Sequence, residues 1–130
     1  MKKFLVFLFV TIAVAASAQV VNLRTIKFYT SEKTSYGWTN WSNPEYSNML
    51  VQIDFVNDLV YIESPIRQLY KIVTITKQGY DNDCNYITEF RFYDQDGDMG
   101  TMRIVGRRDG RSQIYIIFGN VRWCYDVVKL

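Results

Sequence analysis

The sequence contains no histidine, and this absence excludes several kinds of active site. Ser-His-Asp and Cys-His catalysis need an imidazole base, and most transition-metal sites use histidine ligands. The chain has no glycine-rich phosphate loop, and its two cysteines, Cys84 and Cys124, lack the CxxC spacing of redox motifs and zinc ribbons. The sequence therefore predicts a protein that is not an enzyme and needs no cofactor.

Long apolar runs are missing beyond the first 18 residues. Residues 1–18 begin with a Lys-Lys pair, continue with a short apolar run and end in Ala16-Ser17-Ala18, which is the pattern of a signal peptide cleaved after Ala18. The apolar run is too short to cross a bilayer. We therefore expect a bacterial protein, secreted or periplasmic, whose residues 19–130 form one domain without a membrane span.

A large excess of charge is also missing, since 15 Lys and Arg face 13 Asp and Glu. Loss of Lys2 and Lys3 with the signal peptide leaves 13 of each sign. A balanced chain has no overall positive field to attract nucleic acid or an anionic membrane. The expected partner is therefore a protein, a small molecule or a glycan, and not nucleic acid.

The sequence is rich in residues that alternate between apolar and polar types, the pattern of half-buried strands. Four such strands fill Tyr86–Val128 and are joined by three turns that contain Asp, Asn and Gly. A three-residue loop with Gly110 in the left-handed region sets Ile104 opposite Ile114, and a two-residue Gly119-Asn120 turn sets Ile116 opposite Trp123. Both turns predict the same inward face, which we expect to be filled by the core.

The same register bears on the cysteines. An exported protein meets an oxidising compartment, where Cys84 and Cys124 could form a disulfide. Cys124 faces outward beside the inward Trp123, whereas Cys84 has inward parity, and their strands are not neighbours in a meander. Two separate thiols are therefore favoured over a bond.

The first half of the chain supplies the remaining strands. Val20–Thr30 is expected to form a strand with a bulge near Arg24-Thr25, and Gln68–Thr76 another. Met49–Glu63 predicts a hairpin with a two-residue Asn57-Asp58 turn, which places Phe55 opposite Val60.

Together these segments predict an all-β, antiparallel up-and-down meander of about eight strands that closes into a small barrel, with a two-sheet sandwich as the alternative. The succession of hairpin-linked strands loosely resembles small calycin-type barrels, without a family motif. That resemblance implies an interior able to carry a small apolar ligand.

Tyr36–Asn48 is the least regular stretch, with four large aromatic residues among Asn, Ser, Thr and Gly. One interpretation is that Trp38 and Trp41 close one end of the core, since Trp is usually buried in small domains. The other is an exposed platform on which rings stack against a ligand and amides orient it. The candidate ligand-binding residues of this platform are Tyr36, Trp38, Trp41, Asn43 and Tyr46.

Two further groups of acidic residues are candidate sites. Asp94, Asp96 and Asp98 alternate as at the start of a calcium loop, but Met99 and Val105 stand where an EF-hand needs Gly and Glu, so a plain hairpin turn is favoured over a weak metal site. Isolated acids on the strands leave an Asp/Glu-dependent hydrolase as a second alternative to a binding module. The acids in question are Asp54, Glu63, Glu89 and Asp126.

Overall fold

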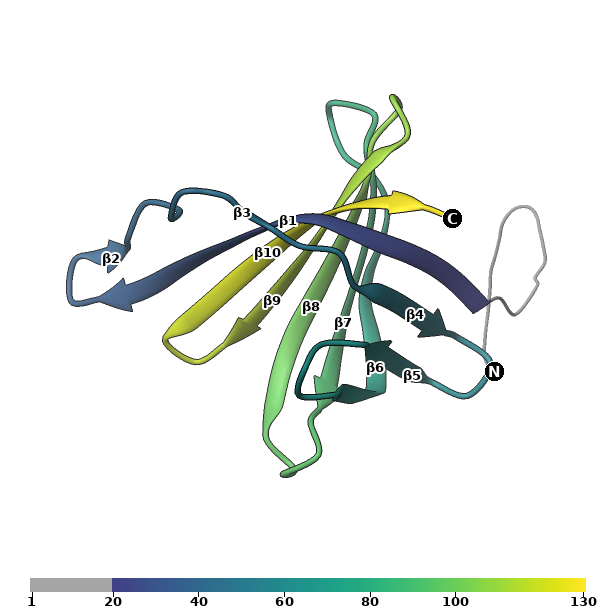
Figure 1. Cartoon of the computed structure of the whole chain (residues 1–130), viewed down its shortest axis with the longest axis horizontal. Helices are drawn as coiled ribbons and strands as arrows, with labels where there is room; N and C mark the ends of the chain where they lie inside the picture. The colour runs from purple at the N-terminus through teal and green to yellow at the C-terminus, as the bar shows by residue number, and fades with distance from the viewer. Residues whose placement is uncertain (1–19) are drawn as a thin grey trace.

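A computed structural model describes residues 20–130, and the predicted signal peptide lies outside this part of the chain. The described residues form a single ten-stranded antiparallel sheet with no helix (Figure 1). The strands are β1 (Val20–Thr34), β2 (Gly37–Trp38), β3 (Glu45–Tyr46), β4 (Leu50–Asp54), β5 (Leu59–Ile62), β6 (Gln68–Tyr80), β7 (Tyr86–Tyr93), β8 (Met99–Gly106), β9 (Arg111–Phe118) and β10 (Val121–Lys129).

Eight of these strands close into a barrel. From β4 to β10 each strand pairs with the next one along the chain, as short hairpin connections require. The long β1 then pairs with β4 on one side and with β10 on the other, from Leu23↔Lys129 to Glu32↔Val121. Closure confirms the predicted barrel and shows that the sandwich alternative is wrong; β2 and β3 are two short additions to the outer edge of β1.

The registers predicted across the last two turns, which join β8, β9 and β10, are confirmed. Gly110 has a φ of 85°, and the Arg107 amide bonds to the Arg111 carbonyl across the three-residue loop. Ile104 consequently lies opposite Ile114. The Gly119-Asn120 turn pairs Ile116 with Trp123 in the same way. Turn chemistry was sufficient here because each Gly adopts a backbone conformation that other residues resist.

The first hairpin was predicted with the wrong turn. Asp54 pairs with Leu59 and Ile53 with Val60, so the loop is four residues long instead of two. The Asp54 carboxylate accepts hydrogen bonds from the backbone N–H groups of Val56 and Asn57 at 2.9 and 3.0 Å, and Asp58 takes a positive φ. The error is a shift of two residues, so the predicted inward face is unchanged.

Two strands run further than the sequence pattern indicates. β1 continues through the polar residues to Thr34, with its bulge at Ile26, one residue beyond the predicted site. β6 continues to Tyr80 through two bulges, and its second half is exposed. Pairing to a neighbouring strand, and not apolar alternation, sets both ends.

The core is formed by the inward faces of the barrel strands, with Phe90 and Phe92 of β7 at its centre. Gly100 on β8 lies beside them. A Cβ atom at this position would be 2.6 Å from the Phe92 ring and 2.9 Å from the Ile117 carbonyl oxygen. Gly100 therefore leaves the room in which the rings of Phe92 and Phe118 meet edge to face at 5.1 Å.

This packing generates a prediction. Gly100→Ala should lower the free energy of unfolding by about 1–3 kcal/mol, because the added methyl group forces a buried ring and a backbone carbonyl apart. Denaturant unfolding of the two proteins measures the difference. Gly106→Ala on the same strand is the control, since its Cβ would have 3.7 Å to the nearest atom. Equal losses for both variants would contradict the close packing around Gly100.

Candidate functional site

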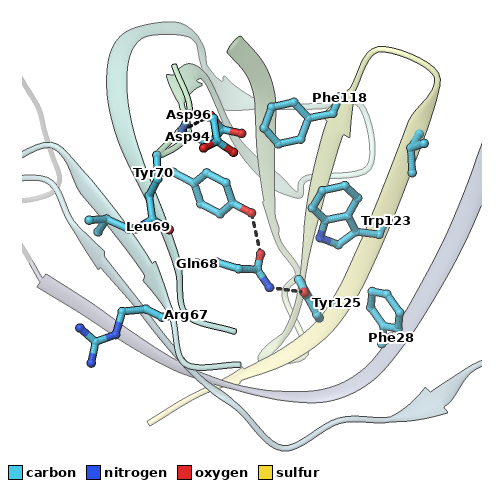
Figure 2. A pocket seen from close by; sticks show the side chains of 12 residues that line it. Phe28, Arg67, Gln68, Leu69, Tyr70, Asp94, Asp96, Phe118, Trp123 and Tyr125 are labelled. Atoms are coloured by element: carbon cyan, nitrogen blue, oxygen red, sulfur yellow. Dashed lines mark hydrogen bonds between the residues drawn. The ribbon is translucent and has the colours of Figure 1, made fainter. Parts of the chain in front are cut away.

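One end of the barrel is open. Alternate turns of an up-and-down meander lie at the same end, which brings together residues 63–67, 94–98 and 119–120. They surround a cavity of about 600 Å³ (Figure 2). Its walls come from β1, β6, β9 and β10 and from these turns: Phe28, Arg67, Gln68, Leu69, Tyr70, Asp94, Gln95, Asp96, Phe118, Val121, Trp123 and Tyr125. We call this space the mouth cavity.

The mouth cavity has aromatic walls. A chain of contacting rings runs from Tyr70 on β6 through Phe92 and Phe118 to Trp123 on β10, with centroid separations of 4.6, 5.1 and 5.9 Å. Phe28 and Tyr125 add a second pair at 5.3 Å. Figure 2 shows Phe118, Trp123, Tyr125 and Phe28 on one side and Tyr70 with Gln68 facing them. Rings fixed by one another in this way offer apolar surface to a ligand without needing to be ordered first.

A short polar chain crosses the cavity between these walls. The Tyr70 hydroxyl donates to Gln68 Oε1 at 2.6 Å, and Gln68 Nε2 donates to the Tyr125 hydroxyl at 3.5 Å. Burial raises the pKa of both tyrosines, so both remain protonated donors at neutral pH. Among residues 20–130 the Tyr125 hydroxyl only accepts a bond, which leaves its proton free for a ligand or for water.

The sequence pattern predicted a site on the aromatic platform and not inside the barrel. Trp123 lies on the inward face, as predicted, but this face was expected to be filled by the core. The order of the turns could have located the cavity. Alternate turns lie at the same end of the barrel, so the inward-facing residues next to those turns must lie at that end too. Gln68, Tyr70 and Phe118 satisfy this condition and were not singled out.

The predicted aromatic platform lies outside the barrel. Tyr36 and Tyr46 are 99% and 95% exposed, and Asn43 is exposed as well. Trp38 and Trp41 hold the side chain of Arg122 between them, with the guanidinium carbon 4.5 Å from each ring centroid. The five predicted residues therefore divide into two exposed tyrosines, one exposed amide and a Trp-Arg-Trp clamp.

The clamp joins the segment between β2 and β3 to the outer wall. Trp41 also lies 6.0 Å from the ring of Tyr115 on β9, and neither indole belongs to the core cluster. The interpretation that Trp38 and Trp41 close one end of the core is therefore wrong. The indoles are attracted to a guanidinium because their ring faces are electron-rich.

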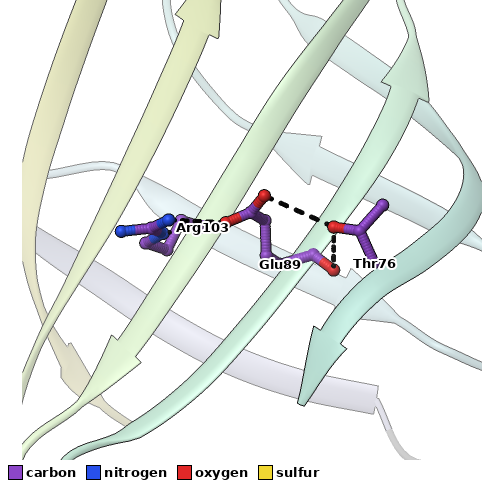
Figure 3. Close-up of polar contacts among 3 residues, drawn as sticks. All are labelled: Thr76, Glu89 and Arg103. Atoms are coloured by element: carbon purple, nitrogen blue, oxygen red, sulfur yellow. Dashed lines mark hydrogen bonds and ion pairs between the residues drawn. The ribbon is translucent and has the colours of Figure 1, made fainter. Parts of the chain in front are cut away.

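The acidic residues considered for hydrolysis have separate partners. Glu89 pairs with Arg103 at 2.7 Å and accepts a weak bond from Thr76 on the outer face (Figure 3). The Asp126 carboxylate accepts a hydrogen bond from the Tyr29 hydroxyl at 2.7 Å, and this bond raises the pKa of Tyr29 to about 12. Burial opposes ionisation of Asp54, but the bonds from Asn57 outweigh it and lower the Asp54 pKa. None of these carboxylates lines the mouth cavity, and Glu63 does not either.

The three aspartates of the β7–β8 turn do come together, with a carboxylate oxygen from each within 4.8 Å of the others. Asp94 Oδ1 accepts the backbone N–H groups of Asp96 and Asp98 at 2.9 and 2.8 Å, as expected of a hairpin turn. Asp94 and Asp96 also reach the edge of the mouth cavity.

The cysteines do not line the mouth cavity and are not bonded to each other. Cys84 is exposed in the turn before β7, and Cys124 is buried on the outer side of β10. Burial, followed by the nearby Asp126 carboxylate, raises the pKa of Cys124 to about 12.

Comparisons with protein families, curated proteins and solved structures found no match to this chain. Residues 20–130 contain no helix with the length and apolar character needed to cross a membrane. The geometry of the mouth cavity is therefore the basis for a functional proposal.

Because the clamp is a local contact on the outer wall, its mutation should have only a small effect on the stability of the fold. Trp41→Ala should reduce the free energy of unfolding by about 1 kcal/mol, the scale of a partly exposed cation–π contact, and not by the roughly 3–5 kcal/mol of a core aromatic residue. Chemical denaturation measures this. Tyr46→Ala, at a position 95% exposed, is the control and should change stability by less than about 0.5 kcal/mol. A core-sized loss for Trp41→Ala would show that the indole supports the barrel interior.

The two thiols should differ in reactivity. At pH 8 a thiol reagent should modify Cys84 rapidly in the native protein, whereas Cys124 should react only after denaturation, because it is buried and remains protonated far below its raised pKa. Thiol counting before and after addition of denaturant gives the numbers. We expect one reactive thiol in the native protein and two in the denatured protein. If the denatured protein had no reactive thiol, the two cysteines would be joined in a disulfide.

Proposed function

We propose that this chain is a binding protein that holds a small amphipathic molecule in its mouth cavity. The observation that supports this most strongly is the volume of about 600 Å³ between aromatic walls, since small-molecule sites fall between roughly 300 and 1,000 Å³. The proposal favours the carrier function implied by the likeness to calycin-type barrels over a role in which the barrel is only a scaffold.

The walls and the polar chain suggest how such a ligand would lie. Its apolar face would stack against Phe118 and Trp123, which are already fixed by contact with each other. A polar group would meet Gln68 and the free proton of the Tyr125 hydroxyl. Few polar groups among many apolar ones is the usual composition of sites that select a ligand by orientation.

The proposal places the protein outside the cytoplasm, in keeping with the signal-peptide pattern of residues 1–18. It assigns binding and not catalysis, because the acids considered for hydrolysis do not line the cavity. The polar side chains that do line it are those of Arg67, Gln68, Tyr70, Asp94, Gln95, Asp96 and Tyr125.

The test is a thermal-shift screen of the purified protein against glycans and small aromatic and aliphatic metabolites. A ligand at a hundred times its Kd should stabilise the fold by about 2.7 kcal/mol. Trp123→Ala should lower the affinity for the best ligand about tenfold or more. Trp123→Leu removes the same ring but keeps an apolar side chain, so it repeats the test with less loss of packing. Trp41→Ala, in the outer clamp, should bind as the unchanged protein does.

Two results would contradict the proposal. One is a screen in which no compound stabilises the protein. The other is a ligand whose binding depends on Trp41 and Tyr46 and is unaffected at Trp123, which would move the site to the outer platform.

A further inference from the structure

We propose that the ligand of the mouth cavity is an organic cation, an amine or quaternary ammonium group carried on an apolar body. This inference rests on the proposed binding function and adds the charge of the ligand. It is drawn from the arrangement of charged groups around the aromatic walls.

The negative charges at the cavity are without cationic partners. Asp94 and Asp96 both line it, and the ion pair found within residues 20–130 joins Arg103 to Glu89 on the outer face instead. Asp94 uses Oδ1 to hold its own turn, whereas its Oδ2 makes no hydrogen bond to another residue of the described chain. Two carboxylates beside low-dielectric aromatic walls favour a cation and repel an anion.

The one basic residue in the cavity lining is directed elsewhere. The guanidinium of Arg67 lies over the ring of Tyr61, 5.0 Å from its centroid. Tyr61 pairs with Gln52 and Leu69 and shares their side of the sheet, opposite to the inward Val60 and Ile62. Figure 2 shows the Arg67 side chain pointing away from Tyr70 and Trp123. Its charge therefore does little to neutralise the two aspartates.

The aromatic walls supply the second attraction. A cation is drawn to the face of Trp, Tyr or Phe because the ring carries negative potential there, and several rings around one ammonium group are a known means of recognition. Tyr70, Phe118 and Trp123 line the same cavity as the two aspartates. The rings of Tyr70 and Phe118 contact each other with their centroids 6.3 Å apart, and Trp123 stacks on Phe118. A fatty acid or another carboxylate would meet the same rings but also the two negative charges.

Three probes with the same benzyl body test the charge: benzyltrimethylammonium, benzyl alcohol and phenylacetate. Isothermal calorimetry in a buffer with a chelator keeps any metal away from the turn. We expect the cation to bind about tenfold or more tighter than the alcohol, and phenylacetate to bind weakest. Raising the salt concentration should weaken binding of the cation and of neither other probe, because salt screens the attraction between the cation and the exposed carboxylates.

The matched variants are Asp94→Asn with Asp96→Asn, which keep the oxygen that accepts the turn hydrogen bonds, and Asp83→Asn in the β6–β7 turn at the other end of the barrel. The double variant should bind the cation several-fold more weakly, because only the attraction of the aromatic rings remains, and Asp83→Asn should leave all three affinities unchanged. A cation affinity that is the same in the double variant as in the unchanged protein would overturn the inference.

Failure of this inference differs from failure of the proposed function. If the screen yields ligands that depend on Trp123 but the alcohol or phenylacetate binds as tightly as the cation, the cation inference is wrong and the binding function stands. If no compound in the screen or among the probes binds, both are wrong.

Discussion

Pairing between β1 and β10 is the contact on which the rest of this structure depends. It joins the two ends of the described chain along nine residue pairs and leaves no open edge among the eight barrel strands. The partner on one side of β1 changes along the strand, and the bulge lies at Ile26: the part before the bulge pairs with β4, and the part after it pairs with β3 and β2. Both parts pair with β10 on the other side. Closure also decides where a ligand can enter, because a closed sheet is accessible only at its ends.

The mouth cavity follows from strand lengths and from one small residue. The β7–β8 hairpin turns at Asp94, so the first residues of β6, which pair with β5 on one side, have no paired strand on their β7 side. Gly100 leaves space for Phe92 and Phe118 to meet, and this contact links the rings of Tyr70 and Trp123 into one wall. The same aromatic residues thus complete the core on their inner side and line the cavity on their outer side.

The outer surface is organised by contacts that are local and independent of the cavity. The Trp38–Arg122–Trp41 clamp fixes the segment between β2 and β3, and the Glu89–Arg103 pair spans β7 and β8. The clamp explains why an aromatic-rich stretch can resemble a binding platform: two of its rings are occupied by an arginine contributed from β10, some eighty residues further along the chain. Only the exposed Tyr36 and Tyr46 are without such a partner in the described residues.

The amino-acid sequence by itself determined the eight barrel strands, the inward face and the register of the last two hairpin pairings, because alternation and glycine turn chemistry are local properties that two neighbouring strands suffice to satisfy. It did not determine the four-residue turn after Asp54, where a side chain accepts backbone hydrogen bonds that no pattern announces. Nor did it reveal the mouth cavity or the partner of Trp38 and Trp41. Tyr70, Trp123 and Asp94 belong to different hairpins, as Arg122 and Trp41 do, and only closure of the barrel brings such residues together.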